Sequence, residues 1–249
     1  MTERTGAPDA LFDVPRLAQV YDPLDPDRSD LDAYVALVDE LGARSVLDVG
    51  CGTGTFACML AARGIDVVGV EPAGASLDVA RSKPDAERVR WIRGDATTLP
   101  HLQVDMATMT ANVAQVFLTD EAWSATLAGI RAALRPGGCF VFESREPTAR
   151  AWTRWNREAT RARAVLADGS SVDSWMDVVD VREPFVSFRT TFVFSVDGAV
   201  LTSESTLRFR GRDELDASLV TAGFTVHDVR DAPDRPGLEL VFITSRSDR

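Results

Sequence analysis

The chain has 249 residues, 45% of them hydrophobic and 26% charged, which are the proportions of a folded globular protein and exclude a disordered one. Asp and Glu (38) outnumber Lys and Arg (27), and the resulting net charge of −11 repels nucleic acid unless basic residues gather on one face, a pattern that the sequence does not indicate. The N-terminus lacks a secretory signal pattern and no apolar run approaches the ~20 residues that span a bilayer, so we expect a cytoplasmic protein without a membrane partner.

Taken in chain order, residues 45–143 alternate short apolar runs with helical patterns, which is typical of βα units and a parallel sheet. The apolar runs predict strands at 45–50, 65–70, 88–95, 104–110 and 139–144. The intervening patterns predict helices at 55–63, 72–83 and 120–134, the last capped by Thr119 or Asp120. The sequence "RPGG" at 135–138 predicts a turn into the fifth strand.

The pattern changes after residue 145. A charged stretch at 148–166 predicts a helix, and residues 170–211, rich in Val, Thr and Phe with a turn at Asp197 and Gly198, predict an antiparallel hairpin or meander. Residues 212–224 return to a helical pattern, and two closing strands share a link too short for a parallel crossover. The expected fold class is α/β: a Rossmann-like, doubly wound, seven-stranded sheet, mostly parallel with an antiparallel closing strand, plus an antiparallel β insertion after the fifth strand.

Three alternating glycines, Gly50, Gly52 and Gly54, follow a strand and precede a helix, a context in which backbone N–H groups meet a ligand. The dinucleotide-binding pattern G-x-G-x-x-G does not match when it is counted from Gly50, because Thr55 occupies its last position. A looser form of the pattern, which ends in alanine, matches from Gly52 to Ala57, but it begins two residues too far past the strand. A nicotinamide-dependent oxidoreductase therefore remains a minor alternative. Asp48, beneath the loop, opposes a pyrophosphate and favours a positively charged ligand.

Four segments in order, "VLDVGCGTG", "VVGVEP", "IRGDATTLP" and "LRPGGCFVFES", resemble the motifs of class I S-adenosylmethionine-dependent methyltransferases. The resemblance implies an enzyme that uses S-adenosylmethionine and releases S-adenosylhomocysteine. It implies that Glu71 accepts bonds from the ribose hydroxyls and Asp95 from the adenine amino group. The other implied cofactor-binding residues are Tyr21, Asp48, Gly50, Cys51, Gly52, Gly54, Pro72, Ala96, Thr110 and Ala111.

Candidates for orienting or deprotonating a methyl acceptor follow the fourth and fifth strands, because ligands of open α/β sheets lie at the carboxyl ends of the strands. We expect Asn112, Glu143 and Arg145 in this role, and His101 is a weaker candidate base, with a plain loop histidine as the alternative. Aromatic residues of the insertion either wall a substrate or form the insertion's own core or a dimer contact: Trp152, Trp155, Trp175, Phe185 and Phe188.

The expected organisation has four parts: an N-terminal lid or leader (1–30), the cofactor-binding core (31–145), an insertion that caps the substrate or contacts a dimer partner (146–211), and a C-terminal part of the sheet (212–249). The tetrapeptide typical of nucleic-acid and protein-amide methylation is absent, since "TANV" stands in its place. Together with the acidic charge, this absence leads us to expect a small-molecule acceptor. Because the two histidines are far apart in the sequence, we expect no metal, and we expect a monomer or homodimer. A non-catalytic protein that binds the cofactor is the alternative.

Overall fold

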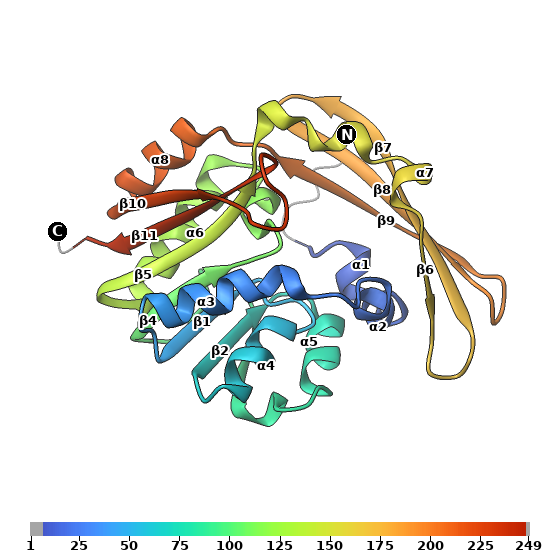
Figure 1. Ribbon diagram of the computed structural model, residues 1–249, viewed down its shortest axis with the longest axis horizontal. Helices are drawn as coiled ribbons and strands as arrows, with labels where there is room; N and C mark the ends of the chain where they lie inside the picture. Colours follow the sequence, from blue (N-terminus) through green and yellow to red (C-terminus); the bar gives the residue numbers. More distant parts are fainter. Residues whose placement is uncertain (1–6, 248–249) are drawn as a thin grey trace.

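A seven-stranded sheet forms the centre of the protein in a computed structural model, which describes residues 7–247 (Figure 1). Its strand order is β10-β11-β5-β4-β1-β2-β3; β11 runs antiparallel to both of its neighbours, and the other pairs are parallel. This arrangement confirms the predicted fold class. The strands are β1 (Ser45–Val49), β2 (Asp66–Glu71), β3 (Val89–Arg93), β4 (Val104–Met109), β5 (Leu134–Arg145), β10 (Phe224–Asp231) and β11 (Glu239–Arg246).

Apolar side chains project from both faces of this sheet, because helices cover it on each side. On β1, Val46 packs in one apolar cluster with helices α3 (Asp32–Glu40) and α4 (Thr55–Ala62). The next residue, Leu47, packs in a second cluster with α6 (Asp120–Ala133) and α8 (Arg212–Thr221). The near-continuous apolar runs of the sequence therefore come from two-sided burial. Helix α5 (Gly74–Arg81) links β2 to β3.

One predicted turn lies inside a strand. The "RPGG" segment was expected to precede β5, but β5 already begins at Leu134, and its register with β4 shifts between Val104 and Met106. Gly137 adopts a φ of 71°, a conformation that a glycine accommodates without strain. The segment is a local irregularity of the strand.

The predicted charged helix at 148–166 is wrong. The segment forms three short turns, η4 (Pro147–Ala149), η5 (Ala151–Arg154) and α7 (Arg157–Thr160), before strand β6 (Ala162–Val165). Arg150 has a φ of 44°, which interrupts the helical path, and the Asn156 side chain caps a new turn by accepting from the Ala159 N–H. Burial of Trp152 against the insertion's sheet fixes this irregular path.

The antiparallel insertion forms as predicted. A second sheet has the order β6-β7-β8-β9, with β7 at Ser171–Arg182, β8 at Phe185–Phe194 and β9 at Val200–Arg208. Asp197 and Gly198 form the β8–β9 turn, where Gly198 has a φ of 69° and the Asp197 carboxylate accepts from the Ala199 N–H. In Figure 1 this second sheet lies beside the central sheet, at the upper right of the view.

The N-terminal segment joins the two sheets. Its helices α1 (Ala10–Asp13) and α2 (Pro15–Leu24) contact both α5 of the core and strands of the second sheet. Leu17 and Val20 of α2 pack against Val172 of β7 and the buried end of β8. We call residues 9–25 the strap; residues 1–6 of the predicted lid lie outside the described residues.

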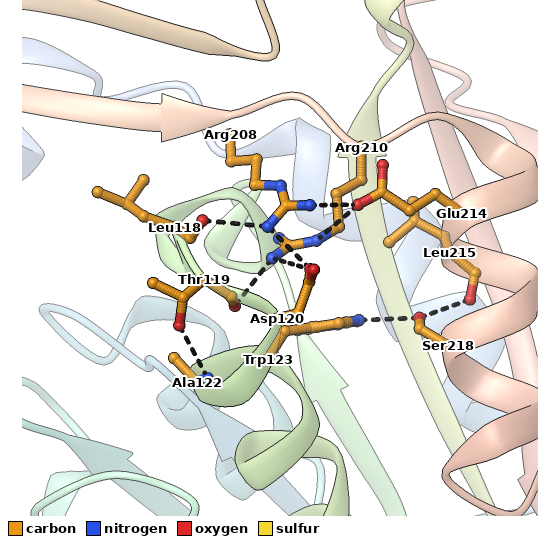
Figure 2. Close-up of polar contacts among 10 residues, drawn as sticks. All are labelled: Leu118, Thr119, Asp120, Ala122, Trp123, Arg208, Arg210, Glu214, Leu215 and Ser218. Atoms are coloured by element: carbon orange, nitrogen blue, oxygen red, sulfur yellow. Dashed lines mark hydrogen bonds and ion pairs between the residues drawn. The ribbon is translucent and has the colours of Figure 1, made fainter.

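Two arginines join the end of β9 to the helices of the core (Figure 2). Arg208 pairs with Asp120 of α6 at 2.8 Å and with Glu214 of α8 at 2.7 Å. Arg210, only 2% exposed, donates to the Thr119 carbonyl at 3.1 Å and lies over the Trp123 ring. The acidic first turns of two helices thus hold the second sheet to the core.

Candidate active site

The glycine loop between β1 and α4 combines tight packing with one open position. Gly50, Gly52 and Gly54 all have positive φ, at 70°, 52° and 77°. A Cβ on Gly50 would lie 2.7 Å from Val113, and one on Gly54 would lie 2.5 Å from Trp91. A Cβ on Gly52 would meet nothing within 4 Å, so the middle of the loop leaves room for a group to approach the backbone.

Asp48 is a buried carboxylate at the end of β1, only 1% exposed, and accepts a hydrogen bond from the Thr108 hydroxyl at 3.2 Å. Burial raises its pKa to about 7, and the nearby charge of Glu71 adds to the effect. No lysine or arginine among the described residues forms an ion pair with it. A cationic ligand would supply the missing counter-charge, because an opposite charge favours the ionised carboxylate.

Glu71 ties the glycine loop to the start of α5. Its carboxylate accepts from the Gly52 N–H at 3.0 Å and from the Ala73 N–H at 2.9 Å, and burial raises its pKa. A carboxylate has about four lone-pair sites, so two remain for a ligand's hydroxyl groups. Cys51, in the same loop, is half-buried; burial and both neighbouring carboxylates raise the pKa of its thiol well above the ordinary value. The thiol is therefore neutral.

The predicted adenine side follows β3. Asp95 is exposed and accepts from the Thr97 backbone N–H at 2.8 Å and from the Thr97 hydroxyl at 2.6 Å, while Ala96 is buried. Pro72, after β2, is exposed. Gly129 of α6, which the sequence analysis missed, permits close packing here, since a Cβ on it would lie 2.0 Å from the Ala96 carbonyl oxygen. A glycine inside an otherwise helical pattern was the available signal.

The loop after β4 turns sharply towards β5. Ala111 and Asn112 both adopt left-handed conformations, with φ of 54° and 59°, directly after Thr110. The Asn112 backbone N–H donates to Glu143 Oε1 at 3.0 Å, and its side-chain Nδ2 donates to Glu239 Oε1 at 3.0 Å. Such strained positions cluster at functional sites.

The three predicted acceptor-side residues meet in one buried cluster. Glu143 is 5% exposed and accepts from the Tyr34 hydroxyl and from Asn112, and burial together with the Glu239 charge raises its pKa to about 7. Arg145 donates to Gln115 Oε1 at 2.9 Å and pairs with Glu239 at 3.4 Å, and burial lowers its pKa.

Three members of this cluster were missed from the sequence: Tyr34, Gln115 and Glu239. The antiparallel register that sets Glu239 opposite Arg145 brings the last strand to this site. No local motif marks Tyr34 or Glu239, whereas Gln115 lies in the polar segment that directly follows β4. Only the paired strands and the packed α3 helix bring them together.

The strap covers the glycine loop from the other side. Asp22 accepts from the Thr53 hydroxyl at 2.7 Å and pairs with Lys83 at 2.7 Å. Asp13 accepts from the Gly74 N–H at 2.9 Å. Tyr21 lies on α2, next to Asp22, and its ring contacts Phe12; burial raises the pKa of the Tyr21 hydroxyl.

Most aromatic residues of the insertion pack with one another. Trp152 meets Phe209 with ring centroids 4.6 Å apart, and Trp155 meets Phe188 at 5.0 Å. These contacts favour the expected alternative that the aromatic residues form the insertion's own core. Trp155 also faces Arg145, whose guanidinium lies 5.4 Å from its ring, and so it connects the insertion to the cluster. His101 lies just before β4 begins, at the opposite edge of the sheet, where it is a plain loop histidine.

Comparison with known proteins finds a similar domain. The model of a methyltransferase domain matches residues 46–138. The cypemycin N-terminal methyltransferase of Streptomyces sp is 35% identical over 116 residues, which are 46% of this chain and 47% of that protein. The chain spans about half the length, or less, of the first curated relatives it matches.

Solved structures share the whole fold. The CcbJ methyltransferase from Streptomyces caelestis matches with a TM-score of 0.73 at 22% identity, covering 93% of this chain and 96% of that one. The sugar N-methyltransferase KedS8 from Streptoalloteichus sp matches with a TM-score of 0.74 at 19% identity, covering 100% and 98%. The predicted resemblance to class I S-adenosylmethionine-dependent methyltransferases is confirmed for the fold, and the matched residues 46–138 are similar to a methyltransferase domain.

Proposed function

We propose that this protein transfers a methyl group from S-adenosylmethionine to a small-molecule acceptor. The observation that carries the proposal is Asp48, a buried carboxylate with a raised pKa and no cation paired to it among residues 7–247, beside the open position at Gly52. This pair of features favours a positively charged ligand without phosphate over a dinucleotide. The match of residues 46–138 to a methyltransferase domain supports the same reading over an oxidoreductase.

The residues present fit this cofactor. Asp48 and the loop from Gly50 to Gly54 would hold the amino acid end, Glu71 the ribose, and Asp95 with Ala96 and Pro72 the adenine. Thr110, Ala111 and Tyr21 would complete the pocket. When bound, S-adenosylmethionine supplies an electrophilic methyl group on a sulfonium and leaves as S-adenosylhomocysteine.

On the acceptor side, the chain's own residues position the acceptor and receive its proton. Glu143 has a pKa of about 7, so it is partly ionised near neutral pH and can take a proton from an acceptor hydroxyl or ammonium. The Tyr34 hydroxyl and the Asn112 N–H fix the carboxylate in place. Arg145 orients the cluster through Gln115. Positioning of two reactants can supply ~7–11 kcal/mol in favourable models, so proton transfer is a smaller contribution.

A small acceptor fits the charge of the chain and the named substrates of similar proteins. The net charge of −11 disfavours a nucleic acid. KedS8 is described as a sugar N-methyltransferase, and the first curated relative acts on the N-terminus of cypemycin. These names support an amine acceptor.

Among residues 7–247, no helix is long and apolar enough to cross a membrane. A cytoplasmic location and a monomer or homodimer remain predictions.

The strap and the insertion would close the two halves of the site. Asp22, paired with Lys83, and Asp13, bonded to Gly74, attach the strap to the cofactor side. The same strap is attached to the second sheet by an ion pair between Arg16 and Asp197 at 2.8 Å. Opening of the strap would therefore expose the cofactor and, at the same time, loosen the attachment of the insertion.

Calorimetry with S-adenosylhomocysteine tests the cofactor step, and absence of binding at millimolar ligand would reject the proposal. A panel of amine, hydroxyl and carbon acceptors, incubated with S-adenosylmethionine and followed by mass spectrometry, tests transfer. A mass gain of one methyl group on an acceptor supports it. Firm cofactor binding without any product across the panel would favour the non-catalytic alternative. NADH binding in place of S-adenosylhomocysteine would favour the oxidoreductase.

A further inference from the structure

Among residues 7–247, three buried polar atoms in the cluster around Glu143 and Arg145 have no hydrogen-bond partner. They are Oδ1 of Asn112, Nε2 of Gln115 and Oε2 of Glu239, and the three residues are only 2%, 1% and 2% exposed. Buried polar groups in folded proteins are nearly always paired, so each exception calls for a ligand, an ordered water or a functional reason. Their occurrence in one cluster points to one missing partner.

The chemical character of each atom is fixed by its neighbours. Asn112 Nδ2 donates to a carboxylate, so Oδ1 of the same amide is an acceptor. Gln115 Oε1 accepts from Arg145, which can only donate, so Nε2 carries two free hydrogens. The cluster therefore offers two acceptors and one donor.

Glu239 shows the same asymmetry within one carboxylate. Its Oε1 accepts from Asn112 Nδ2 at 3.0 Å and from Arg235 Nη1 at 2.9 Å and forms an ion pair with Arg145 Nε at 3.4 Å, whereas Oε2 accepts from no group in the described part of the chain. Two hydrogen bonds and an ion pair on one oxygen hold the carboxylate rigidly. The other oxygen is thereby preorganised to accept a hydrogen from elsewhere.

The charges of the cluster select the type of ligand. Two carboxylates, Glu143 and Glu239, face two guanidinium groups, Arg145 and Arg235, so there is no excess positive charge to hold an anion. Free acceptor atoms outnumber the free donor group. The cluster therefore favours a neutral or cationic ligand that brings hydrogens of its own.

The cluster adjoins the cofactor loop. Val113, the neighbour of Asn112, is the side chain that a Cβ on Gly50 would strike at 2.7 Å. Trp155 of the insertion lies over Arg145 on the other side. A ligand bound here would therefore lie between the cofactor loop and the insertion, where a methyl acceptor belongs.

We propose that Asn112, Gln115 and Glu239 form the acceptor subsite and bind a small hydroxylated amine. Its amine or hydroxyl hydrogens pair with Glu239 Oε2 and Asn112 Oδ1, and one of its oxygens accepts from Gln115 Nε2. This assignment rests on the proposed methyltransferase function and adds Gln115 and Glu239 to the acceptor side.

The test measures binding of glucosamine, galactosamine and serinol by calorimetry at saturating S-adenosylhomocysteine, with cyclohexanecarboxylate as an anionic ligand that has no donor hydrogens. At least one hydroxylated amine is expected to bind, and the carboxylate is not. Gln115→Met and Glu239→Gln should each weaken that binding about tenfold or more, because a site built for hydrogen bonds discriminates strongly when one is lost. Both variants should keep the wild-type affinity for S-adenosylhomocysteine.

Gln103→Met is the matched control, since Gln103 is exposed just before β4 at the opposite edge of the sheet. It should leave binding of all ligands unchanged. If Glu239→Gln fails to fold, Gln115→Met alone decides, because it removes no charge. Cofactor binding without any binding of the three amines, unchanged amine binding in Gln115→Met, or equal binding of the carboxylate would overturn the subsite. Failure of S-adenosylhomocysteine to bind would instead overturn the proposed function.

Discussion

Replacing Asp48 with Asn should stabilise the protein and weaken cofactor binding at the same time. The substitution keeps the shape of the side chain and leaves an oxygen for the Thr108 hydroxyl, but it removes the charge. In the folded protein that charge is 1% exposed and unpaired among the described residues. The charge therefore destabilises the ligand-free protein and makes a favourable interaction only when a cation is bound.

The magnitude follows from the pKa of Asp48. Its ordinary value is 3.8 and its value in the folded protein is about 7. The unfolded chain releases the proton first, so folding becomes less favourable as the pH rises from 3.8 to about 7, and the loss is complete above that range. The full difference corresponds to roughly 4 kcal/mol, at ~1.4 kcal/mol per pKa unit. Asn carries no such penalty at any pH.

Thermal unfolding at pH 4 and pH 8 checks the stability arm. The advantage of the Asp48→Asn variant should be small at pH 4 and grow to about 2–4 kcal/mol at pH 8, which is a rise in Tm of roughly 4–16 °C for a domain of this size. Calorimetry at pH 8 checks the binding arm. Affinity for S-adenosylhomocysteine should fall by ~1–3 kcal/mol, because a charge-assisted contact to its ammonium group is lost.

Two results would refute this reasoning. A variant that is less stable than the wild type at pH 8 would mean that the carboxylate is not a buried, unpaired charge. Unchanged affinity would mean that Asp48 does not contact the ligand's cation. Loss of affinity together with a gain in stability is the combination that a purely structural aspartate cannot produce.

Four further substitutions test other parts of the structure. Glu71→Ala removes the acceptor of two loop N–H groups and should weaken S-adenosylhomocysteine binding by ~1–3 kcal/mol in calorimetry. Gly129→Ala places a methyl group against the Ala96 carbonyl and should lower the free energy of unfolding by ~1–3 kcal/mol in urea titrations, with weaker cofactor binding. Lys83→Met breaks the partly buried ion pair that holds the strap and should raise the dissociation rate of S-adenosylhomocysteine about fivefold in stopped-flow measurements, at ~1 kcal/mol. Arg210→Met removes the hydrogen bond from Arg210, which follows β9, to the Thr119 carbonyl, which precedes α6. The substitution should lower the free energy of unfolding by ~2 kcal/mol, while the affinity for the cofactor stays constant.

Each of these substitutions has an outcome that contradicts its reason. Wild-type affinity in Glu71→Ala would remove that residue from the cofactor site. Gly211→Ala is the control for the glycine substitution, because no atom lies within 4 Å of its Cβ position. Equal effects of the two glycine changes would argue against the close contact. A dissociation rate unaffected by Lys83→Met would mean that the strap does not control release of the cofactor. A loss of cofactor affinity in Arg210→Met would mean that the cofactor site depends on the contact between Arg210 and Thr119.

Local sequence patterns were sufficient for the strands of the core and for the position of the glycine loop. A buried parallel strand is short, apolar and β-branched, and the turn after it must carry residues that suit its backbone. Asp48, the three glycines and Glu71 all lie within this local pattern, and Glu71, the last residue of β2, accepts from the Gly52 N–H. The similarity of residues 46–138 to a methyltransferase domain could therefore be anticipated from the sequence.

The segment at 148–166 shows where local pattern fails. Its composition suits a charged helix, yet burial of Trp152 and contact of Trp155 with Phe188 hold it in separate turns beside the second sheet. Tertiary packing outweighs helix propensity, because each residue's propensity is worth only a fraction of the burial of an aromatic ring. Propensity alone could not reveal that partner sheet.

By itself, the sequence determined the βα order, the glycine loop and the carboxylates at the carboxyl ends of the first strands, since these depend on neighbours within a few residues. Only the tertiary structure decided which distant residues join Asn112, Glu143 and Arg145 on the proposed acceptor side. Tyr34 meets Glu143 across 109 residues, and Asn112 meets Glu239 across 127. Those contacts exist because parallel strands end at one edge and an antiparallel strand begins there, so the pairing of the sheet selects which distant side chains share a buried cluster.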